Sequence, residues 1–193
     1  MIEGHAHEGG KTEVRHFDFG DVRFVSETTL TGYIHACTPA DLERVLTALP
    51  SDDARGLAFV VFHQPTRKEE RAHPRWAAYV PEYVRGPETG PAILLEAINP
   101  SKPLRWSSSL DPEDARELST LKQEGHTVIR EGGSILISLD IETVRQTQRR
   151  SLLHELGHHV DYMRAPRSFA KKTTAEKESF ADRYARDAAP LVL

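Results

Sequence analysis

Three residues of types that bind metals and activate water lie within five positions of this sequence. Residues 154–158 read His-Glu-Leu-Gly-His, so that His154 and His158 are four positions apart. On a helix this spacing places both side chains on one face, one turn apart, where two imidazoles can bind a single zinc ion. Glu155 follows His154, and its carboxylate can reach a water on that ion and take its proton. The segment therefore predicts a zinc site with Glu155 as general base.

The residues around this motif have the pattern of an amphipathic helix. At about 100° per residue, His154 and His158 project within about 40° of each other. The apolar residues of the segment cluster on the opposite side: Leu152, Leu153, Leu156 and Val160. One face is thus expected to pack on a core while the other faces a cleft. The alternative interpretation is an ordinary helix with surface or core-edge histidines, in a chain that has ten of them.

A catalytic zinc needs a further protein ligand, and the segment after the motif offers one. Glu178 and Asp182 are four positions apart and share a face of the last expected helix. Glu178 can complete the site as an oxygen ligand. Asp182 can accept the N–H on the far side of His154 or His158, which orients that ring and raises its basicity. Alternatively, the two acids belong to an ordinary solvated face.

The motifs resemble those of the gluzincin metallopeptidases, in which two histidines and a glutamate from a second helix hold zinc. The interval from His158 to Glu178, twenty positions, is similar to the thermolysin-like spacing. The local sequence motifs most resemble those of the anthrax lethal-factor-like peptidases, which carry a Ser-Ile-Leu strand and a Glu-x-Phe-Ala-acid-x-aromatic helix. The matching residues are Ser134-Ile135-Leu136 and Glu178-Ser179-Phe180-Ala181-Asp182-Arg183-Tyr184. The resemblance covers residues 111–186 and implies a zincin-like fold and a zinc-dependent endopeptidase.

The chain departs from that family at the residue that stabilises the oxyanion. The lethal-factor-like branch has a tyrosine one to two turns before the glutamate ligand. Residues 166–175 contain no tyrosine, and Lys171 stands near the expected position. Tyr162 and His159 are the alternative donors, although a structural role suits both of them better. A catalytically weak or inactive zincin-fold module that binds or regulates another protein is therefore the second hypothesis.

The resemblance also implies how a substrate binds. In the family, the strand pair before the active-site helix forms the upper edge of the cleft, and an extended peptide adds to it as a further strand. Residues 126–130 would then be the substrate-facing edge. An ordinary edge strand is the alternative.

Composition limits the partners and the compartment. The formal charge of −4 and the lack of a basic, aromatic-interleaved patch argue against nucleic acid, and nothing indicates an anionic membrane partner. Residues 1–20 have no apolar signal core and no apolar run is long enough to span a bilayer, so the cytoplasm is the default localisation. A toxin exported by a dedicated machine would have the same features. Cys37 is the single cysteine and lies in a remote segment, which excludes a disulfide and the cysteine ligand of a peptide deformylase.

The remaining elements predict an α+β fold, because separate strands and helices replace a regular β-α alternation. Residues 1–20 are expected to be a flexible lead-in, and residues 21–193 a single domain. Strands are expected at 22–37 (one strand, or a pair broken near residues 31–32), 56–63, 76–84 (an edge strand or an irregular segment), 91–98 (with a helix as the alternative), 126–130 and 134–139. Helices are expected after Thr38, at 112–124, after Asp140, and from the capping box of Thr173 and Glu176 to just before Pro190. Residues 64–75 and 163–172 are expected to be loops.

Overall fold

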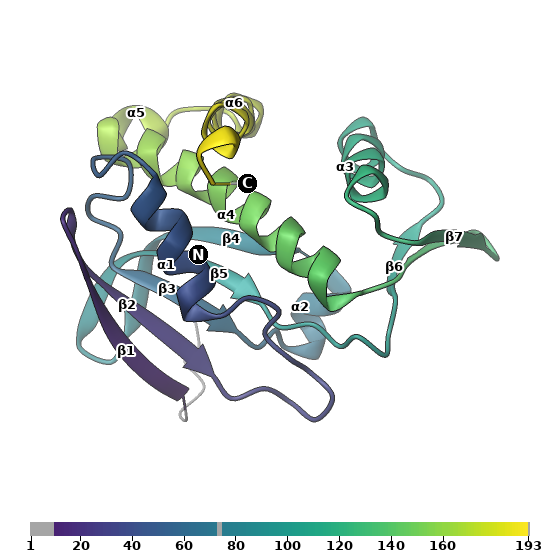
Figure 1. Cartoon of the computed structure of the whole chain (residues 1–193). Helices are drawn as coiled ribbons and strands as arrows, with labels where there is room; N and C mark the ends of the chain where they lie inside the picture. The colour runs from purple at the N-terminus through teal and green to yellow at the C-terminus, as the bar shows by residue number, and fades with distance from the viewer. Residues whose placement is uncertain (1–9, 73–74, 193) are drawn as a thin grey trace.

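The computed structural model describes residues 10–72 and 75–192, and over these residues the chain is an α+β fold (Figure 1). The strands are β1 (Gly10–Phe17), β2 (Gly20–Glu27), β3 (Phe59–His63), β4 (Ala77–Arg85), β5 (Glu88–Glu96), β6 (Leu104–Ser107), β7 (Val128–Glu131) and β8 (Ser134–Ile137). The helices are α1 (Pro39–Ala48), α2 (Arg67–Ala72), α3 (Pro112–Gln123), α4 (Ile141–Arg164), α5 (Pro166–Phe169) and α6 (Thr174–Val192).

The larger sheet is mixed and ends in an antiparallel edge strand. Its order is β1-β2-β3-β5-β4. The inner pairs β2–β3 and β3–β5 are parallel, whereas the outer pairs β1–β2 and β4–β5 are antiparallel. The register of β4 shifts between Val80 and Tyr83, where Pro81 cannot donate a ladder hydrogen bond. The prediction of an edge strand or an irregular segment at residues 76–84 is confirmed in both respects.

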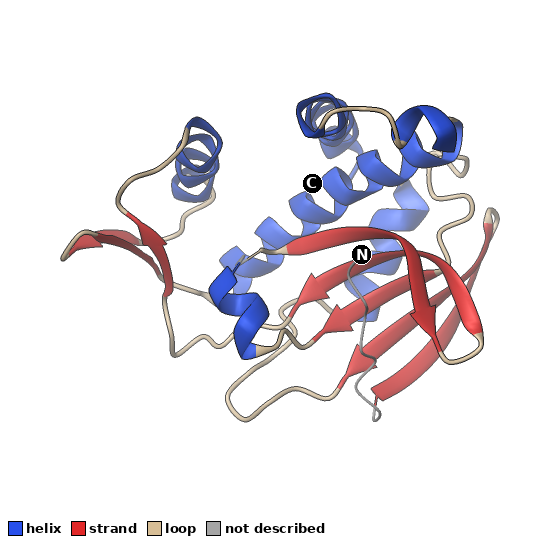
Figure 2. Ribbon diagram, turned by 180° about the vertical axis from the view of Figure 1, so that it is seen from behind, coloured by secondary structure: helices blue, strands red, loops and turns tan. Residues whose placement is uncertain are grey.

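The main core lies between this sheet and the helices α1 and α4, which cover one of its faces (Figures 1 and 2). The central strand β3 alternates, so that Val60 and Phe62 enter this core while Phe59 and Val61 belong to a smaller cluster. The helix α4 contributes Leu152, Leu153 and Leu156, all fully buried, and Val160 is buried as well. The apolar side predicted for the motif helix is confirmed.

A smaller three-stranded sheet, ordered β6-β8-β7, stands to one side of the larger one together with α3 (Figure 2). Its apolar side chains, among them Ile135 and Ile137, form a second core with Val144 near the start of α4. Arg150 fastens α3 to α4 through ion pairs with Glu117 at 2.8 Å and Glu124 at 2.6 Å. The first half of α4 therefore packs against the small sheet, and its second half, which contains the histidine motif, packs against the large sheet.

Three helix starts follow from capping side chains, as predicted. The Thr38 hydroxyl accepts the N–H of Asp41, whose side chain accepts the N–H of Thr38 in return. Asp140 accepts the N–H of residues 142 and 143 at the start of α4. Thr173 and Glu176 form the same reciprocal pair at the start of α6.

Other predictions need correction. Residues 10–17 are not a flexible lead-in but the strand β1, which pairs along its length with β2. Residues 1–9, with His5 and His7, lie outside the described residues. The expected loops each contain a short helix, α2 within residues 64–75 and α5 within residues 163–172. The last helix continues past Pro190 to Val192, because a proline near a helix end disrupts few backbone bonds.

Two further sequence features have a defined place. Cys37 is a buried free thiol, and burial raises its pKa to about 12. Within residues 10–72 and 75–192, every helix is too short or too polar to cross a membrane.

Candidate metal centre

Three ligand atoms from α4 and α6 converge on one point. The Nε2 atoms of His154 and His158 are 3.2 Å apart. Glu178 brings Oε2 within 3.0 Å of His154 Nε2, and Oε1 within 3.5 Å of His158 Nε2. A tetrahedral ion with ligand bonds of about 2.0 Å separates its ligand atoms by about 3.3 Å. The three side chains are therefore spaced closely enough to hold one metal ion, and they are the group of such ligands found among the described residues.

The helices α4 and α6 bring these ligands together. Both histidines lie on α4, one turn apart, and Glu178 lies on α6, which packs across α4. The close approach of the two helices requires a residue without a side chain at Gly157, between the histidines, where α6 presents Ala181. The predicted ligand set of His154, His158 and Glu178 is thus brought to one place by a packing contact within the motif itself.

Asp182 supports the first histidine. Its Oδ1 lies 3.0 Å from His154 Nδ1, on the side of the ring away from the converging Nε2 atoms. Such a carboxylate fixes the tautomer and orientation of a ligating histidine. Of the two rings that Asp182 could have supported, the structure selects His154.

The electrostatics of the cluster favour a bound cation. Hydrogen bonds from His154 and His158 lower the pKa of Glu178 well below its usual range. Burial opposes charge on His154, but its hydrogen bond to Glu178 and the charges of Glu155, Glu178 and Asp182 outweigh that effect and raise its pKa. The surroundings therefore stabilise positive charge at the point where the ligand atoms meet.

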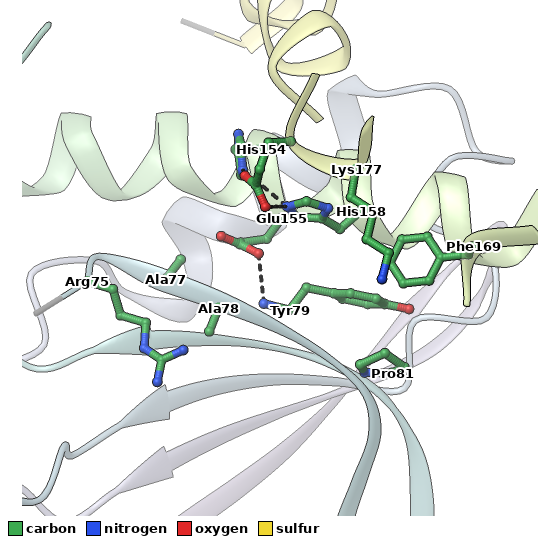
Figure 3. A pocket seen from close by; sticks show the side chains of 11 residues that line it. Arg75, Ala77, Ala78, Tyr79, Pro81, His154, Glu155, His158, Phe169 and Lys177 are labelled. Carbon is green, nitrogen blue, oxygen red and sulfur yellow. Dashed lines mark hydrogen bonds and ion pairs between the residues drawn. The ribbon is translucent and has the colours of Figure 1, made fainter. Parts of the chain in front are cut away.

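Glu155 projects toward the same pocket and is held by the sheet. Its Oε2 accepts a hydrogen bond of 2.7 Å from the backbone N–H of Tyr79 in β4 (Figure 3). Burial raises the pKa of this carboxyl, against the opposing charges of His154 and His158 and the Tyr79 hydrogen bond. A carboxyl with a raised pKa, beside a candidate metal site and facing a cavity, has the properties of a proton carrier.

The pocket is an opening of about 310 Å³ between α4, α6 and the start of β4. On the sheet side it is lined by Ala77, Ala78, Tyr79 and Pro81, and on the helix side by the ligands and Glu155 (Figure 3). Residues 126–130, expected to be the substrate-facing edge, overlap the edge strand β7 of the small sheet, but none of them lines this pocket. The His126 ring is buried instead against Thr147 Oγ1, at 2.9 Å, and the Ser138 carbonyl oxygen, at 3.1 Å.

The two candidate oxyanion donors lie outside this lining. His159 is fully buried on α4. Its Nε2 lies 3.0 Å from the Arg55 carbonyl oxygen, and its ring is edge-on to Tyr79. Tyr162 packs its ring against Phe169 and Tyr79. Lys171, at the position of the family's tyrosine, is exposed. The structure brings none of the three to the ligands.

Sequence reasoning missed the residues that complete the pocket. Arg75 and the β4 residues come from a segment about 75 positions before the motif, and nothing in their spacing relates them to it. Phe169 lies on α5 and Lys177 on α6, and Lys177 could have been suggested by its position directly before Glu178. Comparisons with protein-family models, with curated proteins and with solved structures found no match to this chain.

Proposed function

We propose that this protein is a zinc-dependent endopeptidase with a zincin-like fold, in which His154, His158 and Glu178 hold the metal and Glu155 is the general base. The observation that carries the proposal is the convergence of three ligand atoms within 4.8 Å of one another beside a pocket that Glu155 also lines. The resemblance to the lethal-factor-like gluzincins, stated above from the motifs alone, points to the same activity.

The donor set fits zinc. Two imidazole nitrogens and one carboxylate oxygen are the ligands of many catalytic zinc sites, which keep a fourth position open for water or substrate. Here the pocket adjoins the three ligands and provides the space for that position. Zinc bound there would lower the pKa of a coordinated water toward about 7 and polarise the carbonyl of the peptide.

Glu155 carries out the proton transfers of the reaction. Glu155 takes the proton of the attacking water and delivers it to the amine that leaves. The N–H of Tyr79 orients the carboxylate, and burial raises its pKa, which makes the carboxylate a stronger base.

The edge strand β4 is the proposed binding site for the peptide. The N–H of Tyr79 points away from β5 toward Glu155, so the outer peptide groups of β4 face the pocket. Because the Tyr79 N–H already binds Glu155, the outer groups that remain for a peptide are the Tyr79 carbonyl oxygen and the peptide groups of Ala77, which point to the same side two residues earlier. An extended peptide that paired with this edge would pass the ligand cluster, and Pro81 would end the pairing.

Substitution of Glu155 tests the proposal. The protein loaded with zinc is expected to bind about one ion per chain and to cleave peptides from a degenerate library. Glu155→Gln should retain the zinc and lose cleavage by about a thousandfold or more, because the proton acceptor is removed while the three ligands remain. Glu131→Gln, an exposed change on β7 outside the pocket, is the control and should cleave normally. Hydrolysis retained by Glu155→Gln would remove Glu155 from this role.

A second candidate function is a zincin-fold module that binds or regulates a protein without cutting it. It is favoured by one observation. Tyr79 is the only tyrosine that lines the pocket among the described residues, and its hydroxyl lies 3.4 Å from His159 Nδ1, so that it faces His159 instead of the ligands. The same library separates the two functions, since a binding module retains peptides and leaves them intact.

A further inference from the structure

A lysine, Lys177, forms part of the pocket wall. Lys177 is half-buried on α6, immediately before the ligand Glu178, and its side chain extends into the pocket beside Phe169 (Figure 3). Its Nζ lies 4.4 Å from the centre of the Phe169 ring. The Tyr162 ring meets the same phenyl ring edge-on, with centroids 5.6 Å apart, and so holds it in place.

This ammonium group has no carboxylate partner among the described residues, although its neighbours do. Lys172 pairs with Asp161, and Arg75, at the other side of the pocket, lies 3.2 Å from Glu96. Lys177 forms no such ion pair within residues 10–72 and 75–192, and its contact is the face of Phe169. A partly desolvated cation gains most from an anion that approaches it directly.

The acids nearest in the pocket are already engaged. Glu178 lies 3.0 Å from His154 and 3.5 Å from His158, and Glu155 accepts the N–H of Tyr79. The acids that line the pocket are therefore not free to pair with Lys177, and a substrate can supply the anion. Phe169 adds an apolar wall beside the ammonium, which suits a carboxylate carried on a short methylene chain.

We propose that Lys177 binds a carboxylate of the substrate close to the scissile bond, so that the preferred peptides are acidic at this subsite. This inference rests on the proposed peptidase function and gives it a substrate class. The carboxylate has two sources, an aspartate or glutamate side chain or the free C-terminus of the peptide, and the second would make the enzyme act as a carboxypeptidase on that peptide. Both present the same group to Lys177 and to Phe169.

Paired peptides test the inference. For each position next to the cleaved bond, one pair of peptides has glutamate in one member and glutamine in the other. A further pair has a free C-terminus in one member and an amidated C-terminus in the other. The wild-type protein is expected to favour the carboxylate peptide by about tenfold or more in kcat/KM, as for other hydrogen bonds to charged groups. Lys177→Met should abolish this preference, because kcat/KM for the carboxylate peptide falls to that for the neutral peptide, and Lys177→Arg should keep it. The pair that responds identifies the source.

Lys171→Met is the matched control, because it removes the same charge from an exposed position outside the pocket, and it should leave the preference unchanged. Zinc content and circular dichroism establish that each variant is folded. An equal fall for the charged and the neutral peptide in Lys177→Met would overturn the inference, since Lys177 would then act on every substrate alike.

Binding provides a readout that does not depend on turnover. Fluorescence anisotropy of the same peptides with Glu155→Gln should show tighter binding of the carboxylate peptide, and Glu155→Gln with Lys177→Met should lose the difference. If the wild-type protein cleaved no peptide but this difference in binding persisted, the proposed endopeptidase would fail and the carboxylate subsite would stand. If cleavage occurred without any preference, the subsite would fail and the endopeptidase would stand.

Discussion

Gly157 and Ala181 are in contact at the crossing of α4 and α6. A Cβ built on Gly157 would lie 2.7 Å from Ala181 Cα and 3.1 Å from the Ala181 carbonyl oxygen, distances at which the backbone of α6 has to move. Gly157 directly precedes His158, and Ala181 lies three residues after Glu178. The distance between the two helices therefore also sets the distance between the ligands.

Gly157→Ala is expected to weaken the metal site without changing a ligand. The added methyl group pushes α6 away, which lowers the free energy of unfolding by about 1–3 kcal/mol and separates Glu178 from the histidines. Thermal unfolding and titration with zinc measure the two effects. Gln146→Ala, an exposed change on α4, is the control. Unchanged zinc affinity in Gly157→Ala would show that the ligands do not depend on this helix contact.

Asp182→Asn is expected to reduce zinc affinity by about 10- to 100-fold, because the carboxylate that accepts the His154 Nδ1–H is replaced by a neutral amide. The Asp182 side chain is 64% exposed, so the substitution should leave the fold intact. Competition with a chelating dye measures the affinity. Asp187→Asn removes an exposed acid of the same helix and should bind zinc like the wild-type protein; equal losses in both variants would mean that only the overall charge matters.

Zinc should stabilise the wild-type protein, and Glu178 should be needed for it. At a free zinc concentration of about 100 times Kd, binding to the folded state adds about 2.7 kcal/mol, or about 5–10 °C in Tm for a chain of this size. In Glu178→Gln the shift is expected to be smaller than about 2 °C, since one of three ligands is lost. A chelator should reverse the wild-type shift. A full shift in the variant would exclude Glu178 as a ligand.

Glu96 is expected to make the protein less stable as the pH rises. This carboxyl is buried beside Arg75, and burial raises its pKa from 4.5 to about 7, against the opposing charges of Arg75 and His63. Between about pH 4.5 and pH 7 the folded state binds the proton more tightly than the unfolded state, so the free energy of unfolding falls with pH, by at most about 3 kcal/mol.

Urea unfolding at pH 5 and at pH 7.5 checks this dependence. The difference in unfolding free energy between the wild-type protein and Glu96→Gln should change in favour of the variant at the higher pH. Glu82→Gln, which removes an exposed carboxylate of β4, should follow the wild-type protein at both values. A difference independent of pH would show that Glu96 is ionised throughout.

The local features of this protein could be predicted from sequence because local interactions determine them. The helix periodicity of residues 152–160 places His154 and His158 on one face, and the hydroxyl or carboxylate of Thr38, Asp140 and Thr173 caps the helix that follows. Glu178 and Asp182 were found in the same way, since their spacing on α6 repeats the logic of the histidine pair. Only the ring that Asp182 supports had to be read from the structure.

The wall of the pocket was decided by tertiary packing. The order of strands in a sheet depends on which buried faces fit together, and residues 126–130 and β4 have equally plausible patterns for an edge strand. The structure puts β7 in the small sheet and β4 beside Glu155, where a hydrogen bond from Tyr79 crosses 76 positions of sequence. Likewise, Lys177 enters the pocket, and Tyr162 and His159 stay out of it, because of how α5 and α6 pack on α4. The sequence by itself determined the residues that meet at the candidate metal site; the packing of α4 against β4 and α6 decided what surrounds them, since contacts between distant segments have no spacing to reveal them.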